Sequence, residues 1–321
     1  MNSAQSDVWI AVDWGTSNVR FWAISKAAAT EGDILNSASA DKGAGALQSD
    51  EFEACLLDHV SAWLNQSGPT DVVICGMAGA RNGWREAPYA DVTADIAEIA
   101  RNAVSVPCDH QGLNVRILPG LSQQSPPDVV RGEETQLVGL LRHEPHFTGW
   151  VVMPGTHSKW VKITAGSLKS SCTAMTGEIF ALLKSQSILR HSLATQERGD
   201  ASDDLLGTAF SDAVQEVWQT PALVLPGLFQ LRASDILGVS QQEVVASAAD
   251  RAARLSGLLI GWEIYSVLSG KATEEEICIV GSAYLGSAYQ CAFAQLGLKS
   301  RQLQGDKLVL GGLKSAYDLL T

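Results

Sequence analysis

The sequence predicts an α/β protein with two domains, and three observations carry this prediction. Apolar segments typical of buried strands alternate with segments of helical periodicity. The length of 321 residues exceeds that of most single domains, which usually contain about 100–200 residues. A unit of strand, Gly-Thr turn and strand occurs twice, once near the N-terminus and once near the middle. Two similar halves that face one another would place both polar turns at one cleft.

The first half is predicted to open with a hairpin. In "VWIAVDWGTSNVRFWAI", residues 8–24, two apolar strands flank the polar turn "GTSN". A helix over 52–64 leads into "DVVICGMAG", a strand that stops at glycines. A short strand over 114–120 and a helix over 134–144 follow. This alternation of strands and helices is that of an α/β domain.

The second half repeats the opening pattern. In "GWVVMPGTHSKWVKI", residues 149–163, Gly155-Thr156 aligns with Gly15-Thr16 of the first turn. The later residues are mainly helical until 275–297, where a strand ends at Gly281 and small residues open a helix. The Pro- and Ser-rich segment 119–128 predicts the boundary between the halves. We therefore expect domains over 1–118 and 119–305, with a C-terminal helix over about 306–321 packed on the first.

Composition argues against several classes of partner. The formal net charge is -12, whereas nonspecific binding to nucleic acid or to an anionic membrane requires clustered Lys and Arg. The apolar stretch "LSGLLIGWEIYSVL" contains Glu263 and falls short of the roughly 20 apolar residues of a membrane span. No export signal is visible, and the six cysteines are scattered without metal-binding spacing. We expect reduced thiols and a cytoplasmic protein.

The turn "GTSN" predicts an anion site. Its backbone amides and side-chain donors can bind phosphate, and Asp13 just before it can hold Mg²⁺ directly or through water. An ordinary hairpin turn uses the same residue types. The second Gly-Thr turn and the glycine that opens a later helix favour the phosphate site over an ordinary turn. The sequence contains neither a Walker A loop nor a GxGxxG after a strand.

These motifs, in this order, resemble the sugar kinase, Hsp70 and actin superfamily. Longer strings resemble the 2-dehydro-3-deoxygalactonokinase family from about residue 8 to the C-terminal helix: "CGMAGARNGWREAPY", "PGLSQQSPPDVVRGEETQLVGLL", "MTGEIFALLKSQSILRHS" and "ARLSGLLIGWE". The resemblance implies a two-domain actin-like ATPase fold, related to ribonuclease H, with a nucleotide and substrate cleft between the domains. It also implies ATP- and Mg²⁺-dependent phosphorylation of the C6 hydroxyl of 2-dehydro-3-deoxygalactonate in galactonate catabolism.

Phosphoryl transfer requires phosphate cradles, a metal and an oriented hydroxyl group. We assign the nucleotide to residues of both turns and of the later glycine-opened helix: Gly15, Thr16, Ser17, Asn18, Gly155, Thr156, His157, Gly281, Ser282 and Ala283. Lys159 either neutralises phosphate charge or simply lies on its strand. Asp13 is the expected metal ligand, because Met153-Pro154 stands where an acidic residue often precedes the second turn in this superfamily.

The general base is expected between the two turns, where related sugar kinases have an Asp. Here "RGEETQ" offers Glu133 and Glu134. Glu133 is the preferred base because its distance in sequence from the following helix fits better. The sequence does not exclude Glu134 as the base. A solvated helix N-terminus would also favour a Glu pair, because the helix dipole attracts negative charge.

The substrate is itself a carboxylate, so this acidic protein needs a local cation to bind it. Arginine suits this role because its planar fork binds a carboxylate bidentately. Arg81 is preferred because it follows a strand end and a glycine-containing loop. The other candidates near the turns are Arg20 and Arg131, and Trp84 lies in the same string as Arg81.

Several alternatives stay open from the sequence. A kinase for 2-keto-3-deoxygluconate would differ only in the configuration of one substrate hydroxyl. A non-catalytic ATP-binding relative would share the turns but would have no reason to keep the Glu pair and the loop arginines. A transcriptional regulator would need a DNA-binding module, and only about seven residues precede the first strand. The expected partners are ATP and a small sugar acid, and a homodimer is left open.

Overall fold

The structure is a computed structural model that describes residues 7–27, 34–193, 206–239, 247–271 and 274–321. Two compact units divide the chain. The first contains Met1–Phe147, Ile163–Ser171 and Gln304–Thr321, and the second contains Thr148–Lys162 and Cys172–Leu303. The first unit thus includes residues 119–147, which the sequence assigns to the second domain, and the predicted domain boundary stays a prediction. The expectation for the N-terminal residues 1–6 lies outside the described residues.

The first unit is built on a six-stranded sheet with the order β3-β2-β1-β4-β7-β6. Its strands are β1 (Val8–Trp14), β2 (Val19–Ser25), β3 (Ile34–Ala40), β4 (Thr70–Gly76), β6 (Val104–Val106) and β7 (Leu113–Ile117). β1 pairs antiparallel with β2, so the predicted opening hairpin is present. β1 pairs parallel with β4, and Trp14 lies opposite Gly76. The first Gly-Thr turn therefore lies at the edge of the sheet where β4 ends.

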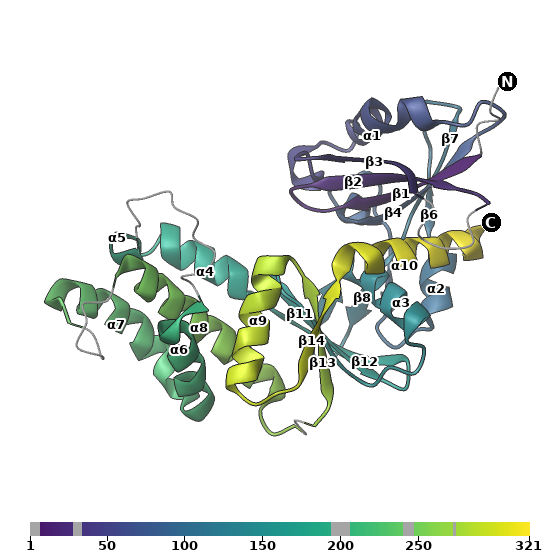
Figure 1. The fold of residues 1–321 in the computed structure, drawn as a ribbon. Helices are drawn as coiled ribbons and strands as arrows, with labels where there is room; N and C mark the ends of the chain where they lie inside the picture. The colour runs from purple at the N-terminus through teal and green to yellow at the C-terminus, as the bar shows by residue number, and fades with distance from the viewer. Residues whose placement is uncertain (1–6, 28–33, 194–205, 240–246, 272–273) are drawn as a thin grey trace. The chain divides into compact units, whose positions relative to one another are not determined.

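Different helices cover the two faces of this sheet, as the alternation of side chains along a strand requires. Ile10 and Val12 of β1 pack in a cluster with residues of α1 (Phe52–Val60). Trp9 of β1 packs in a second cluster with residues of α10 (Gly305–Leu320), on the opposite face (Figure 1). The rings of Trp9 and Tyr317 are stacked with centroids 4.4 Å apart. The C-terminal helix therefore completes the core of the first unit.

Helix α3 (Glu133–His143) packs against α10 in direct backbone contact. A Cβ atom at Gly139 would lie 1.9 Å from the carbonyl oxygen of Leu308. A Cβ atom at Gly312 would lie 1.9 Å from the carbonyl oxygen of Thr135. Each helix thus contributes one glycine that lets the other approach. This contact fixes the position of α3, whose first two residues are the candidate bases.

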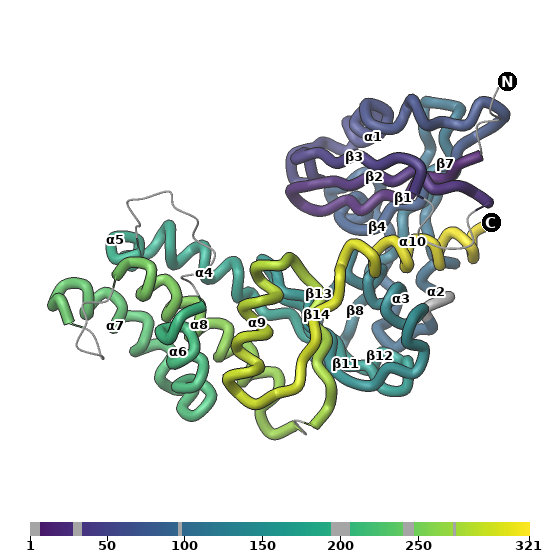
Figure 2. The backbone as a smooth tube through the Cα atoms, viewed as in Figure 1, coloured from purple at the N-terminus to yellow at the C-terminus, as the bar shows by residue number. Residues whose placement is uncertain are grey.

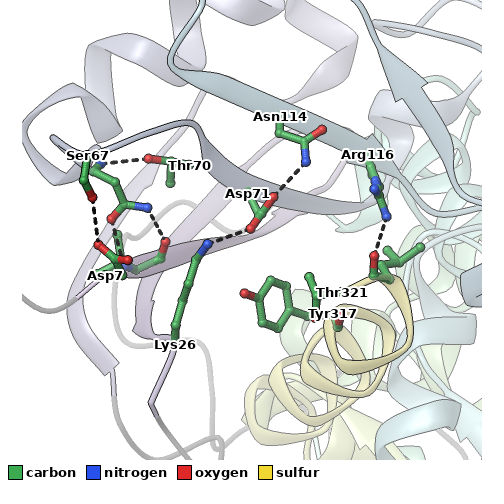
Figure 3. A network of polar contacts seen from close by, with 12 residues as sticks. Asp7, Lys26, Ser67, Thr70, Asp71, Asn114, Arg116, Tyr317 and Thr321 are labelled. Carbon is green, nitrogen blue, oxygen red and sulfur yellow. Dashed lines mark hydrogen bonds and ion pairs between the residues drawn. The ribbon is translucent and has the colours of Figure 1, made fainter.

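A polar network joins the strands of the first unit to the end of α10 (Figure 3). Lys26 pairs with Asp71 at 2.9 Å, and Asn114 donates to the other carboxylate oxygen of Asp71 at 2.7 Å. Arg116 donates to the carbonyl oxygen of Leu320 at 2.8 Å. Asp71 lies near the start of β4, whereas the first Gly-Thr turn lies near its end. We therefore interpret this network as structural, with its partly exposed Lys26–Asp71 ion pair contributing up to about 1 kcal/mol.

A small sheet completes the first unit, with the order β5-β8-β9. Its strands are β5 (Tyr89–Asp91), β8 (Gly120–Gln123) and β9 (Asp128–Val130), and a short helix, α2 (Ile96–Arg101), follows β5 in the chain. The side-chain amide of Gln123 donates to the carbonyl oxygens of Pro126 and Ser171 and accepts the Ser171 N–H at 2.9 Å. This buried amide fastens residue 171 to the β8–β9 hairpin.

A second sheet, with the order β12-β11-β10-β13-β14, consists mainly of residues of the second unit, although Ile163–Ser171 of β11 and β12 are grouped with the first. Its strands are β10 (Gly149–Met153), β11 (Ser158–Thr164), β12 (Ser167–Ala174), β13 (Glu276–Gly281) and β14 (Ser300–Gln304). This order matches β3-β2-β1-β4-β7 of the first sheet, position by position. The repeat predicted from the two Gly-Thr turns is therefore a repeat of strand order as well. The α/β class and the two related sheets of an actin-like fold are confirmed.

Helices follow β12 in the second unit. They are α4 (Thr176–Ser185), α5 (Arg190–Leu193), α6 (Thr208–Gln219), α7 (Val224–Leu237), α8 (Ala248–Leu268) and α9 (Ala283–Gln295). Helices α6 and α8 run side by side (Figure 2). Glu263 of α8 is buried and accepts hydrogen bonds from Trp160 and Tyr289, both at 2.7 Å. Within the described residues, no helix is both long enough and apolar enough to cross a membrane.

Candidate active site

The turn between β1 and β2 has the geometry of an anion site. The N–H groups of residues 43–45 donate to the carbonyl oxygens of Gly15, Thr16 and Ser17, all at 2.9 Å. A trans peptide holds its C=O and N–H on opposite sides, so the N–H groups of residues 16–18 point away from these donors. Within the described chain no acceptor occupies these three N–H groups, and all three residues are exposed. Successive outward N–H groups form a nest that binds phosphate oxygens.

Asp13 lies beside this turn, near the end of β1. Arg20 is its partner in the β1–β2 register and donates to one carboxylate oxygen at 2.6 Å. The thiol of Cys75 lies 3.7 Å from the other oxygen. Among the described residues, no group of three or more His, Cys, Asp or Glu side chains could hold a metal ion. One carboxylate still suits Mg²⁺, which usually takes its other ligands from water and substrate phosphates.

The two candidate bases have different environments at the start of α3. Gly132 precedes them with φ +100°, and a Cβ atom there would lie 3.3 Å from the Cα atom of Gly76 at the end of β4. Glu134 is only 1% exposed and accepts hydrogen bonds from the Gly132 N–H and, at 2.9 Å, from the Thr135 hydroxyl. Burial, with the charge of Glu133 second, raises the pKa of Glu134 to about 8. Glu133 is partly exposed.

Arg81 and Trp84 belong to one loop but have different surroundings. The Arg81 side chain is 86% exposed, with Glu86 at 3.8 Å. Trp84 packs against Phe52 and Trp14, with ring centroids 6.1 Å and 6.2 Å away. The exposed guanidinium can reach a ligand, whereas the indole anchors the loop to the core cluster.

The other two candidate arginines are held by the protein. Arg131 donates to the carbonyl oxygen of Ala87 at 2.8 Å, and its guanidinium lies 4.3 Å from the centroid of the Tyr89 ring. Arg20 pairs with Asp306 at the start of α10 in addition to Asp13. Both side chains bind other residues of the first unit. Fewer of their N–H donors are therefore available to a substrate carboxylate.

The second Gly-Thr turn lies between β10 and β11. A Cβ atom at Gly155 would meet nothing within 4 Å, and its φ does not lie in the left-handed region. Neither backbone conformation nor crowding therefore requires a glycine here, and its open face is available to a ligand. The His157 imidazole is hydrogen-bonded to Glu178, whose N–H donates to the Thr156 carbonyl oxygen at 2.9 Å. The buried Lys159 donates to the His157 carbonyl oxygen at 3.1 Å.

The predicted adenosine segment lies at the junction of β13 and α9. Gly281 ends β13, and a Cβ atom there would lie 3.4 Å from the ring of Pro154 beside the second turn. Ser282 is the N-cap of α9, accepting the Leu285 N–H at 3.4 Å, and Ala283 is the first helical residue. The end of β13 and the second turn are therefore neighbours within the second unit.

The sequence profile of the family described as 2-keto-3-deoxy-galactonokinase matches residues 13–316. The chain belongs to this family. It is 39% identical over 310 residues to a Rhizobium meliloti (strain 1021) protein named "Probable 2-dehydro-3-deoxygalactonokinase DgoK1", with 96% of each chain covered. It is 35% identical over 310 residues, again 96% of each chain, to the 2-dehydro-3-deoxygalactonokinase of Escherichia coli (strain K12).

A solved structure agrees with this membership. The crystal structure of a Sinorhizobium meliloti protein assigned as a 2-dehydro-3-deoxygalactonokinase has a TM-score of 0.83 to this chain at 38% identity. The alignment covers 96% of this chain and 95% of that chain. The family suspected from the sequence strings is thereby confirmed over nearly the whole chain.

In this family member, each unit carries one set of the predicted residues. The first unit holds those around the first turn and the start of α3: Asp13, Gly15, Thr16, Ser17, Asn18, Arg20, Arg81, Trp84, Arg131, Glu133 and Glu134. The second unit holds the others: Gly155, Thr156, His157, Lys159, Gly281, Ser282 and Ala283. Sequence reasoning missed residues 43–45 and Glu178, which contact the turns. The glycines of "KGAGA" (42–46) and of "MTGE" (175–178) are the sequence features that could have indicated these close contacts.

Proposed function

We propose that this chain is an ATP-dependent kinase that phosphorylates the C6 hydroxyl of 2-dehydro-3-deoxygalactonate, giving the 6-phosphate and ADP in galactonate catabolism. Membership of the family supports the reaction and the substrate class. The observation that carries the proposal is the set of three outward N–H groups over residues 16–18 beside Asp13. Such fixed donors bind phosphate without reorganisation, and much of phosphoryl-transfer catalysis is positioning and charge stabilisation.

The nucleotide would be held by the two turns and the start of α9. The N–H groups of residues 16–18 bind phosphate oxygens, and the open face of Gly155 admits a phosphate close to the backbone. Asp13 holds Mg²⁺ directly or through water. ATP supplies the transferable phosphoryl group when bound, and Mg²⁺ neutralises its charge.

Glu133 is the proposed general base. The residue is partly exposed at the N-terminus of α3, but its Oε2 atom is buried, so Oε1 is the oxygen proposed to orient the C6 hydroxyl and accept its proton. Glu134 is buried and its raised pKa favours the neutral acid at pH 7, so it suits a structural role at the start of the helix. Arg81 is the proposed ligand of the substrate carboxylate, because its guanidinium is exposed while Arg20 and Arg131 are engaged within the protein.

Measurement of ADP release tests the proposed reaction. The assay contains Mg-ATP with 2-keto-3-deoxygalactonate, its gluconate epimer, galactonate or no sugar acid. A strong preference for the galactonate-derived keto acid supports the proposal. Equal activity on the two epimers would support kinase activity but would refute the assigned stereochemistry of the substrate. Absence of activity on every acid would favour a non-catalytic ATP-binding protein.

A pair of matched variants tests the choice of base. Glu133→Gln should lower kcat by about two to four orders of magnitude, the usual contribution of general acid–base catalysis, with ATP affinity retained. Glu134→Gln should retain most of the activity, because an amide resembles the neutral acid. The reverse result would assign the base to Glu134. We also propose a cytoplasmic location, which fractionation of cells would test. Light scattering on the purified protein would show whether it forms the homodimer that the sequence leaves open.

A further inference from the structure

Each candidate phosphate turn is backed by a short segment at the same position in the duplicated strand order. In the first unit, β3 ends at Ala40 and residues 43–45 follow it. In the second unit, β12 ends at Ala174 and residues 176–178 follow it as the first turn of α4. β3 and β12 occupy equivalent edge positions in their sheets. The internal repeat thus extends beyond the turns to the segments that contact them.

The contact in the first unit is made by backbone atoms. Residues 43–45 donate three N–H···O hydrogen bonds of 2.9 Å to the turn. Gly43 is buried, and a Cβ atom there would lie 2.5 Å from the backbone N and C atoms of Ser17. A Cβ atom at Gly45 would lie 3.1 Å from the Thr16 carbonyl oxygen. A methyl group at position 43 must therefore displace the turn, while one at 45 requires a shift of a few tenths of an ångström.

The contact in the second unit has the same character. A Cβ atom at Gly177 would lie 2.4 Å from the carbonyl oxygen of Gly155 and 2.8 Å from the Cα atom of Thr156. The Glu178 N–H donates to the Thr156 carbonyl oxygen at 2.9 Å, so the N–H of the next residue, His157, points away from α4. Glu178 also holds the His157 imidazole through its carboxylate. Gly177 and the Glu178 N–H therefore set the orientation of the Thr156–His157 peptide, as residues 43–45 do for the first turn.

We propose that residues 43–45 and 176–178 are equivalent braces, and that Gly43 and Gly177 are positioning residues for the nucleotide phosphates. The inference rests on the proposed function and deepens it. By donating N–H groups to the turn's carbonyl oxygens on one side, each brace fixes the turn's own N–H donors on the other side, where an anion can approach. Donors fixed before binding lose little conformational entropy when the ligand arrives. The braces therefore act on phosphate affinity without contacting the phosphate.

The test compares binding of ATP and of adenosine by calorimetry. The variants are Gly43→Ala, Gly45→Ala and Gly177→Ala. Gly68→Ala is the matched control, because a Cβ atom at this exposed loop position would meet nothing within 4 Å. Adenosine lacks phosphates, so misplaced turn donors should leave its affinity unchanged. Thermal unfolding followed by circular dichroism reports whether each variant is folded.

We expect ATP affinity to fall by about ten- to a hundredfold in Gly43→Ala and Gly177→Ala, the loss typical of one hydrogen bond to a charged group. The loss should be smaller in Gly45→Ala and absent in Gly68→Ala, following the order of the Cβ distances. Adenosine affinity should stay at the wild-type value throughout. An equal loss for ATP and adenosine, or unchanged ATP affinity in folded variants, would overturn the proposal.

Replacement variants are available if a glycine variant does not fold. If Gly43→Ala does not fold, Gly45→Ala decides the first brace. If Gly177→Ala does not fold, Glu178→Pro decides the second: it removes the N–H donated to Thr156 at a first-turn helix position where proline is tolerated, and Glu178→Ala is its control. Wild-type protein that binds adenosine but not ATP would refute the proposed phosphate turns themselves. That outcome is distinct from a failure of the braces.

Discussion

The buried carboxyl of Glu134 should make the stability of the protein fall as pH rises. Its pKa is raised from 4.5 to about 8, first by burial and second by the charge of Glu133. The folded protein therefore holds this proton more tightly than the unfolded chain does. The stabilisation is complete below the unfolded pKa and is lost as pH rises to the folded value. At 1.36 kcal/mol for each pKa unit, the total is on the order of 5 kcal/mol.

Glu134→Gln should remove this dependence, because the amide cannot ionise. Urea unfolding of both proteins at half-unit steps from pH 5 to 9 measures the free energy of unfolding. Between pH 5 and 8 the wild-type value should fall relative to that of the variant by about 1.4 kcal/mol for each pH unit. Above pH 8 the difference should level off. The comparison cancels the other titrating groups that the two proteins share.

Glu133→Gln is the matched control at the neighbouring position. It removes the negative charge that contributes to the raised pKa of Glu134. The free energy of unfolding should therefore level off at a lower pH, while its slope below that pH stays the same. Parallel curves for wild type and Glu134→Gln would refute the reasoning, because Glu134 would then not change its protonation on unfolding in this range.

Substitutions at Gly139, Gly155 and Asp13 should have three different effects. Gly139→Ala should lower the free energy of unfolding by about 1–3 kcal/mol, because its methyl group meets a carbonyl oxygen of α10. A value near that of Gly68→Ala in urea unfolding would contradict this packing. Gly155→Ala should leave the melting temperature unchanged yet weaken ATP binding in calorimetry, and equal affinities would remove Gly155 from the site. Asp13→Asn should raise the Mg²⁺ concentration for half-maximal activity, and an unchanged magnesium titration would exclude it as the metal ligand.

Much of the fold could be predicted because the relevant signals are local. The strands on both sides of Gly15 and Gly155 are apolar and interrupted by a turn, and the structure has hairpins at both places. The helix predicted over 134–144 is α3, shifted by one residue. β3 was not predicted, because this edge strand is mostly exposed and only two small side chains, those of Ala38 and Ala40, pack against the core.

The candidate site was only partly predictable, because contacts between distant segments decide its chemistry. A charged residue at a helix start is typical of an exposed side chain, yet Glu134 is buried where Gly132 approaches the end of β4. Trp84 occurs in a string rich in candidate ligands, but its ring packs against other aromatic rings. Residues 43–45 carry no reactive group, and their role is visible only from the distances to the turn.

The packing of α10 on the first sheet has a consequence for how the chain folds during synthesis. Residues 305–320 cover the face of the sheet that contains Trp9, although the ribosome makes them after all of the second unit. Domains usually fold in order from the N-terminus as they emerge. Here the emerging first sheet keeps an apolar face without its helix until synthesis reaches residue 320. The second unit, whose segments end at residue 303, can complete its core earlier.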